Sequence, residues 1–383
     1  YKVAKVKLAY ITDSLGASMA SMSPVASYGP YYTGLIAAQL TALNLTTDAW
    51  SVYFKYLPFN FYAIIAVLLA WYSSASGKEI GTMYLAEKRA LETGRLMAPN
   101  DVPIGSDSDE EQFSDKSKLK ISNFFIPMIS LLLALFATIF YTGNIAENGF
   151  PDVFYNADIS LSIICGMTVG GLATLLVGVK SKIFSISDGF EEWIEGMYLS
   201  IQVNLIIVFA WALSTVSETM GLKLFIASIV EQLGIPAMLI PAFVFLAGCI
   251  ISFATGSSWG TTALLMPISY EIGIPIHIAV ASCIAGGIFG DHCSPISDTT
   301  IKASMAAGCD HMQHVQTQLP YALIAGFSGF IAFLLGGFIS NTIVCLGVAL
   351  IIAFVLFNFA HRQTVKKYKD YDFSKELETV SIK

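Results

Sequence analysis

Long uncharged runs alternate with short polar segments along the chain, and this pattern predicts membrane-spanning helices. Seven runs lack any charged residue: 59–72, 124–141, 159–179, 199–213, 235–254, 319–339 and 343–360. Most of them approach or reach the roughly 18 to 20 residues that a helix needs to cross a hydrocarbon core of about 30 Å. The apolar residues are continuous and do not alternate with period 2, which argues against a membrane β-barrel. The pattern therefore predicts an all-α polytopic membrane protein.

The polar segments between these runs predict how the chain is oriented. The longest, 76–120, holds seven Lys and Arg residues and nine Asp and Glu residues, and its stretch GSDSDEEQFSD is typical of a disordered linker. The gap at 142–158 has no Lys or Arg, whereas the tail at 361–383 begins with several basic residues. The positive-inside rule then places 76–120 and the tail in the cytoplasm and 142–158 on the other side.

Two short segments resemble one another and indicate an internal repeat. ITDSLGAS (11–18) and ISDTTIKAS (296–304) both carry Ile, a hydroxyl residue, Asp and a second hydroxyl residue, followed by Ala-Ser. Paired, interrupted apolar segments of this kind are typical of transporters built from two repeats. We therefore predict four parts, listed in chain order: the remainder of a first repeat at 1–75, an acidic cytoplasmic linker at 76–120, a second repeat at 121–360 and a cytoplasmic tail at 361–383. The second repeat has several spans before its motif and the first has none, so we expect the chain to begin partway into a longer protein.

Composition agrees with a membrane location and excludes other classes. Of the 383 residues, 55% are hydrophobic and only 13% are charged, against about 25% charged in soluble domains. The net charge of −7 argues against a nucleic-acid partner, because nucleic-acid binding requires basic surface. The six cysteines show no spacing typical of a disulfide framework.

The region 252–304 is too apolar for a loop and too interrupted for regular spans. It is rich in Gly, Ser and Thr, and Pro267, Pro275 and Pro295 break helices. Irregular backbone at membrane depth survives where it lines a cavity or is buried in protein. We therefore predict re-entrant hairpins and discontinuous helices here. The GxxxG spacings at 166–170 and 286–290 predict close helix contacts.

This region holds carboxylates that are costly in a bilayer, at about 2.5 to 3.5 kcal/mol on insertion scales, and such groups are usually functional. Asp291 and Asp298 flank Pro295 and are surrounded by hydroxyl groups, a donor set suited to a hard cation. Burial also disfavours the charged form, so such a carboxylate can hold a proton when the cation is absent. The alternative is that one Asp caps a helix at the membrane interface.

The repeat comparison gives Asp13 the same predicted role as the two aspartates of the second repeat, with a water-exposed helix cap as the alternative. The neutral oxygens that we predict around the cation come from seven residues: Ser14, Thr255, Ser257, Ser258, Ser294, Ser297 and Thr299. Close packing through small residues is the alternative for the segment 255–262.

A zinc site is a further alternative. His292, Cys293, Cys309 and His311 are of types that bind Zn²⁺. No HExxH motif accompanies them, and we expect His311 and His314 to lie at the cytoplasmic surface. We therefore expect Na⁺ rather than zinc at this site.

The motifs FGDHCSPISDTT (289–300), AGCDHMQHVQTQLPYAL (307–323) and ATGSSWGTTALLMPI (254–268) resemble the NhaC-type Na⁺/H⁺ antiporter family of the ion transporter superfamily. AYITDSLGASMASMSPVASYG (9–29) is similar to the first-half segment of that family, although no counterpart of the TGSSWGT segment precedes it. The resemblance covers nearly the whole chain apart from the acidic loop and the tail. It implies an inner-membrane secondary transporter with inverted repeats and helical hairpins that exchanges Na⁺ for H⁺.

We therefore expect a transporter, not an enzyme, that exchanges Na⁺ for H⁺ across the cytoplasmic membrane without a cofactor. Asp291, Asp298 and Asp13 are the predicted cation and proton carriers. One alternative is a Na⁺- or H⁺-coupled carrier of a small carboxylate or amino acid, and a distant one is a membrane-embedded zinc hydrolase. Besides the two ions, the expected partners are the lipid bilayer and, in a homodimer, a second copy of the chain. The transported solute and the stoichiometry stay open.

Overall fold

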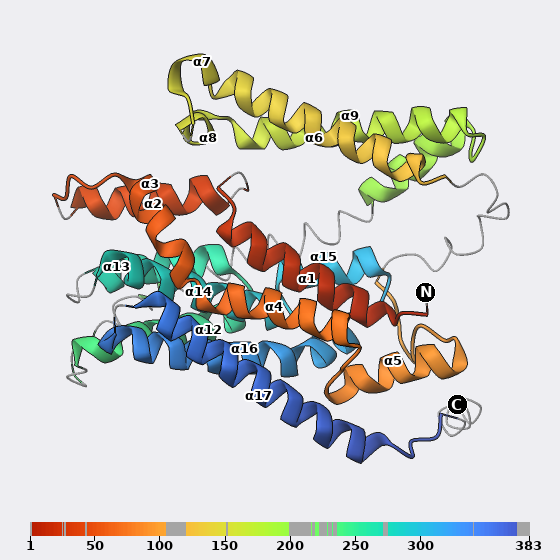
Figure 1. Cartoon of the computed structure of the whole chain (residues 1–383). Coiled ribbons are helices and arrows are strands. Elements are labelled where there is room, and N and C mark those ends of the chain that lie inside the picture. The colour runs from red at the N-terminus through yellow and green to blue at the C-terminus, as the bar shows by residue number, and fades with distance from the viewer. Residues whose placement is uncertain are drawn as a thin grey trace. The chain divides into compact units, whose positions relative to one another are not determined.

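The computed structural model describes residues 2–104, 120–198, 236–270 and 275–373, except positions 25, 27, 43, 151 and 340, together with a few isolated residues between 216 and 232. Helices make up the regular structure of these residues, and no β-strand occurs among them (Figure 1). The predicted apolar run at 199–213 lies outside the described residues.

Five helices of the described part are long and apolar enough to cross a membrane. They are α6 (Ser122–Thr142), α9 (Ile159–Lys180), α14 (Ile276–Cys293), α16 (His311–Phe338) and α17 (Thr342–Tyr368). A sixth candidate is bent by 47° at the short break between residues 59 and 61. These helices confirm the prediction of an all-α polytopic membrane protein, and four of them coincide with predicted runs or extend them; the inverted repeat stays a prediction.

Several of these helices begin at a polar capping residue in the chain. Asp158 accepts a hydrogen bond from the Leu161 amide at the start of α9, and Asn341 caps α17 in the same way. Such caps satisfy backbone N–H groups that have no partner inside the helix. α16 begins at His311 after the cap Asp310, eight residues before the predicted run, because its polar first turns are covered by neighbouring helices instead of ending the helix.

The contacts divide the chain into two compact units. Unit 1 comprises residues 1–22, 32–105 and 205–383, and unit 2 comprises residues 23–31 and 106–204. These units do not coincide with the predicted halves 1–75 and 121–360, so the assignment of two repeats stays a prediction.

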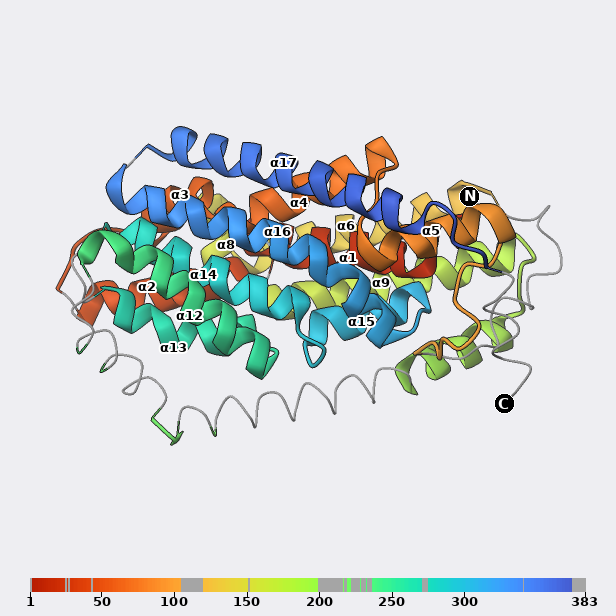
Figure 2. The ribbon, with the colours of Figure 1, turned by 90° about the horizontal axis from the view of Figure 1, so that it is seen from below.

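Unit 1 contains most of the helices. Besides α14, α16 and α17 they are α1 (Lys5–Met22), most of α2 (Tyr28–Ala42), α3 (Ala49–Tyr56), η1 (Leu57–Phe59), α4 (Phe61–Ser76), α5 (Gly81–Thr93), η3 (Ala237–Leu239), α12 (Ile240–Thr255), α13 (Ser258–Tyr270) and α15 (Asp298–Ala307). Helix α14 is the centre of this unit, because it contacts α1, α3, α4, α12, α13, α15 and α16. Figure 2 shows α17 alongside α16, and α16 in turn contacts α14.

Glycines allow α12 and α14 to approach closely. A Cβ added at Gly286 would lie 2.4 Å from the Phe245 carbonyl oxygen, and one at Gly290 would lie 2.4 Å from the Phe253 nitrogen. No larger residue fits at either position without moving the backbone. The predicted helix contact at 286–290 is therefore confirmed, and it fixes the end of α14 against α12.

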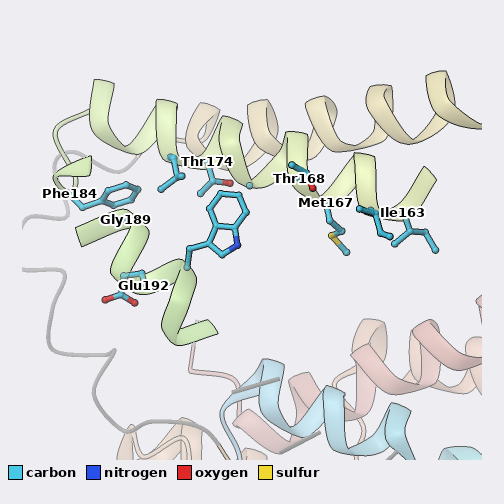
Figure 3. A pocket seen from close by; sticks show the side chains of 11 residues that line it. Ile163, Met167, Thr168, Thr174, Phe184, Gly189 and Glu192 are labelled. Atoms are coloured by element: carbon cyan, nitrogen blue, oxygen red, sulfur yellow. The ribbon is translucent and has the colours of Figure 1, made fainter. Parts of the chain in front are cut away.

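Unit 2 contains a hairpin of α6 and α9, joined by the short helices α7 (Ile145–Asn148) and α8 (Asp152–Asn156) (Figure 1). Gly166 and Gly170 of α9 lie against Leu131 and Leu135 of α6, which confirms the second predicted glycine contact. Large apolar side chains of α6 are exposed, as expected for a helix that faces lipid. A cavity of about 610 Å³ lies between α9 and a helix over residues 186–198; Figure 3 shows Ile163 and Met167 on the α9 side.

Part of the predicted linker 76–120 is folded. Residues 81–93 form α5, which contacts α1, α16 and α17, and Glu79 just before it is buried. The sequence pattern gives no sign that a charged residue here will find a buried partner, so α5 was not expected; the assignment of 76–120 as an acidic cytoplasmic linker stays a prediction. The acidic stretch GSDSDEEQFSD lies outside the described residues.

Candidate cation-binding site

Two helix breaks meet inside unit 1. Helix α12 ends at Gly256, whose φ of 66° is readily adopted only by glycine, and α13 begins two residues later. Helix α14 ends at Cys293, and α15 begins at Asp298. A Cβ added at Gly256 would lie 2.7 Å from the Ile296 carbonyl oxygen, so the two breaks are in close contact. The predicted interruptions of the region 252–304 are therefore present.

Asp291 lies in the last turn of α14 and is 1% exposed. Its Oδ2 accepts a hydrogen bond of 2.6 Å from the Ser258 hydroxyl, and its Oδ1 accepts one from the Ser297 hydroxyl. A negative charge is unfavourable at a helix C-terminus and favourable at an N-terminus. Ser258 is the first residue of α13 and Ser297 caps α15. The favourable dipoles at the N-termini of these two helices therefore offset the unfavourable dipole at the C-terminus of α14, where this carboxylate lies.

The other predicted oxygens of the second half lie around the same breaks. Ser297 Oγ and Thr299 Oγ1 are 2.9 Å apart. The Ser294 hydroxyl donates to the Phe253 carbonyl and joins the two breaks, while the Thr255 hydroxyl donates to the carbonyl one turn earlier in α12. A hydroxyl that donates to a carbonyl keeps its lone pairs, so each can still coordinate a cation.

Asp13 lies in the middle of α1 and is 2% exposed. Its Oδ2 accepts a hydrogen bond of 2.8 Å from Gln318 Nε2, while its Oδ1 has no hydrogen-bond partner among the described residues. The charge of Asp291 acts on it, and the hydroxyls of Thr299 and Thr300 lie nearby. Its neighbour Ser14 is fully buried. The exposed helix cap considered for Asp13 is therefore wrong, and α1 delivers a second buried carboxylate to the helix breaks.

Asp298 differs from the other two aspartates. Its side chain is 31% exposed, and its Oδ2 lies 2.7 Å from Lys302 Nζ one turn later in α15. It acts electrostatically on Asp291, and Ser297 rather than Asp298 caps the helix. The expectation of an enclosed Asp298 therefore does not match the structure, because α15 turns this side chain away from the interior. Its role as a carrier stays a prediction.

The charge balance of the site is unusual for a buried location. Neither Asp13 nor Asp291 forms an ion pair with Lys or Arg in the part of the chain that the structure describes. Buried charges in proteins are ordinarily paired or bind a metal ion. Two neighbouring carboxylates without a basic partner thus form a site that can bind a cation or a proton.

Three further residues belong to the site: Gln318 and Tyr62, which were not singled out from the sequence, and His292, which was considered only as a zinc ligand. Gln318 Nε2 donates to Asp13 Oδ2 and to the His292 carbonyl. The His292 ring is fully enclosed and bonds to Ser14 Oγ at 2.9 Å and to the Tyr62 hydroxyl. In the sequence, the signals that could have pointed to the site were a polar Gln and a His beside apolar runs. Only the packing of α1, α4, α14 and α16 shows that these side chains contact one another.

The histidines at the start of α16 also differ from expectation. His314 is 0% exposed, and only His311 is partly exposed, so the predicted position at the cytoplasmic surface is wrong for His314. It is covered because α15 packs against α16. No group of three or more His, Cys, Asp and Glu residues in the described residues is arranged to hold a metal ion, so the zinc alternative gains no support.

A second buried charged cluster lies elsewhere in unit 1. Lys7 Nζ of α1 is 2.8 Å from Glu79 Oε1, and the two side chains are 4% and 6% exposed. Glu79 also accepts hydrogen bonds from the hydroxyls of Ser73 and Tyr321. This pair was not predictable from the sequence, because its partners lie 72 residues apart on segments that pattern alone places at a membrane surface.

A polytopic helical bundle with buried carboxylates where two broken helices meet is typical of secondary transporters. The chain belongs to the Na⁺/H⁺ antiporter family, whose pattern it matches over residues 19–338.

Individual proteins are also similar to this chain. An uncharacterised protein of Haemophilus influenzae is 30% identical over 353 residues, which cover 88% of this chain and 65% of that protein. The malate-2H⁺/Na⁺-lactate antiporter of Bacillus subtilis is 27% identical over 48% of this chain and 40% of its own length. The Na⁺/H⁺ antiporter NhaC of Alkalihalophilus pseudofirmus is 31% identical over 37% of this chain and 30% of its own length. The chain thus spans less than two thirds of these relatives, and no solved structure matches it.

Proposed function

We propose that the protein exchanges Na⁺ for H⁺ across the cytoplasmic membrane and that Asp291 and Asp13 are the groups at which the two ions compete. The observation that carries this proposal is a pair of buried carboxylates with no Lys or Arg partner in the described residues. Asp291 accepts hydrogen bonds from hydroxyl groups at two helix breaks, and Asp13 accepts one from the amide of Gln318. Family membership supports it.

The chemistry of the donors suits this exchange. Na⁺ is a hard cation that prefers carboxylate, hydroxyl and carbonyl oxygens, and the site offers all three. A proton on Asp291 removes the charge that attracts Na⁺. Each ion therefore lowers the affinity for the other, and carrying them in opposite directions requires only that the site open alternately to the two sides. Each net charge moved is worth about 2.3 kcal/mol per 100 mV, so the stoichiometry decides whether voltage drives turnover.

The orientation is part of the same proposal. The basic residues of 76–120 and of the tail support a cytoplasmic location for both segments. Asp298 is paired with Lys302 beside the enclosed site, and in this proposal it offsets the positive charge of Lys302 near Asp291.

The test is Na⁺-driven proton movement in proteoliposomes that contain the full-length protein. We expect Asp291→Asn to abolish it, because the amide keeps the shape but loses the charge. Asp158→Asn is the matched control, since Asp158 caps α9 and Asn caps a helix equally well. Asp298→Asn should retain exchange at a reduced apparent Na⁺ affinity. Normal exchange by Asp291→Asn would reject the proposal.

A coupled carrier of a small carboxylate or amino acid is the second candidate. Ser18 Oγ and Asn60 Oδ1 are buried and have no hydrogen-bond partner among the described residues. Ser18 lies one turn beyond Ser14 on the same face of α1, so these atoms could bind polar groups of an organic solute. Relatives named for malate and lactate or for arginine and ornithine also favour it. Uptake of labelled malate, lactate and arginine by the same proteoliposomes separates the two candidates.

A further inference from the structure

A hydrogen-bonded chain of side chains connects the partly exposed His311 to the buried Asp13. His311 Nε2 bonds to the Pro295 carbonyl at 2.7 Å, and His311 Nδ1 bonds to Ser304 Oγ at 3.0 Å. The same Ser304 oxygen bonds to His314 Nδ1 at 2.8 Å. His314 Nε2 then bonds to Gln318 Oε1 at 2.8 Å. One serine therefore bridges two imidazole rings.

The orientation of the Gln318 amide determines which atom donates in its hydrogen bond with His314. Both of its known Nε2 partners, Asp13 Oδ2 and the His292 carbonyl, accept hydrogen bonds when Asp13 is ionised. Its nitrogen must therefore face these two groups, and its oxygen must face His314. His314 Nε2 consequently carries a hydrogen.

The donors and acceptors of this hydrogen-bonded series of side chains determine how many protons it needs. The Pro295 carbonyl at one end and Gln318 Oε1 at the other accept hydrogen bonds only, so the Nε2 atoms of His311 and His314 must both donate. If both rings are neutral, their Nδ1 atoms can then only accept, and Ser304 has a single hydrogen for two acceptors. Satisfying all four ring-nitrogen bonds requires one proton more than the neutral side chains carry. The Ser304 hydroxyl also donates to the Thr300 carbonyl, at 2.8 Å one turn earlier in α15, so a third acceptor competes for the same hydrogen.

We infer that His311, Ser304 and His314 form a proton-binding site that takes up one proton and is joined through Gln318 to the carboxylate of Asp13. This inference rests on the proposed Na⁺/H⁺ exchange and gives the proton a place of its own beside the cation site. Burial opposes the charge of an imidazolium, and the hydrogen bonds of the two rings act in the other direction. Because His311 is partly exposed and His314 is enclosed, the site lies between solvent and Asp13.

Other charged or titratable groups lie on several of the segments near this site. They are Lys5 and Asp13 of α1; Arg89 of α5; Asp101 after α5; Asp291, His292 and Cys293 of α14; Asp298 and Lys302 of α15; and Cys309 and Asp310 before α16. Carboxylates outnumber the basic side chains among them, which favours an added positive charge.

The experiment is nuclear magnetic resonance of full-length protein labelled with ¹⁵N-histidine in lipid bilayers, followed from pH 9 to pH 5. We expect the pair to take up one shared proton while the second ring stays neutral. Ser304→Ala should move that uptake to lower pH by about one unit, because it removes a bridging bond worth about 1.5 kcal/mol. Alanine is a good helix former, so α15 should persist. His277→Gln, in the first turn of α14, is the control that should leave the uptake unchanged.

The inference fails if His311 titrates alone with the same midpoint in wild type and Ser304→Ala while His314 stays neutral throughout. It also fails if His314→Gln leaves the titration of His311 unchanged. Both outcomes are independent of transport. The proposed function fails separately, if wild-type proteoliposomes show no Na⁺-driven proton movement.

Discussion

Unit 1 holds two buried charged regions, which differ in how the charge of a carboxylate is compensated. The Glu79 region comprises Glu79, Lys7, Ser73 and Tyr321, and the Asp291 region comprises Asp291, Asp13, Ser258 and Ser297. In the Glu79 region, a carboxylate is neutralised by Lys7 at 2.8 Å. In the Asp291 region, two carboxylates lie close together without any Lys or Arg partner in the described part of the chain. Both regions are enclosed, and both use serine hydroxyls as hydrogen-bond donors. They differ in whether the chain itself supplies the positive charge.

That difference suits the two regions to different roles. A buried carboxylate with its own lysine has no need of an external ion, and it holds α1, α4, the start of α5 and α16 together. A buried carboxylate without one is costly to keep ionised until a cation or proton arrives. The Asp291 region therefore suits the proposed binding and release of ions, and the Glu79 region favours stability.

The largest expected contrast comes from the same chemical change made in both regions. Glu79→Gln leaves Lys7 buried without its counter-charge and should lower the free energy of unfolding by about 3 to 5 kcal/mol. Asp13→Asn removes one of two like charges and should leave stability unchanged or raise it, while Na⁺ affinity falls. Denaturant titration of the full-length protein in detergent measures both variants. Equal destabilisation by the two changes would contradict the distinction.

Glycine turns give the next contrast, because each region contains one with positive φ. Gly256, at 66°, would place a Cβ 2.7 Å from the Ile296 carbonyl, whereas Gly77, at 65°, has open space. Gly77→Ala should cost about 1 to 2 kcal/mol from backbone strain alone. Gly256→Ala should cost about 1 to 3 kcal/mol more and weaken Na⁺ binding, because it separates the two helix breaks. Similar losses and unchanged Na⁺ binding would show that the close approach is unimportant.

Serine hydroxyls give the smallest contrast. Ser297→Ala removes a donor to Asp291 Oδ1 and a neutral oxygen, and it should weaken Na⁺ binding by about tenfold, as for a charged hydrogen bond of 1.5 kcal/mol. Ser73→Ala removes the corresponding donor to Glu79 and should leave Na⁺ affinity unaltered at a cost of about 1 kcal/mol in stability. Isothermal titration with NaCl checks both variants; an effect of Ser73→Ala on Na⁺ affinity would mean that the regions are coupled.

The helices were largely predictable because length and hydropathy act locally. The runs at 124–141 and 159–179 became α6 and α9 with ends shifted by a few residues at most. The start of α16 was missed, because its polar first turns are stabilised by burial against other helices. Likewise α5 was predicted as linker, since a charged segment reads the same whether or not its acid finds a buried lysine.

The sequence by itself determined the membrane class, the broken helices at 252–304 and the choice of Asp291 as a candidate site residue, because apolar length, Gly and Pro positions and the cost of a carboxylate in lipid are properties of the chain. Only the tertiary structure decided that Asp13 belongs with Asp291, that Asp298 turns toward Lys302, and that Lys7 neutralises Glu79. The physical reason is that the energy of a charge depends on its neighbours, and helix packing brings these neighbours from segments as distant as α1 and α14.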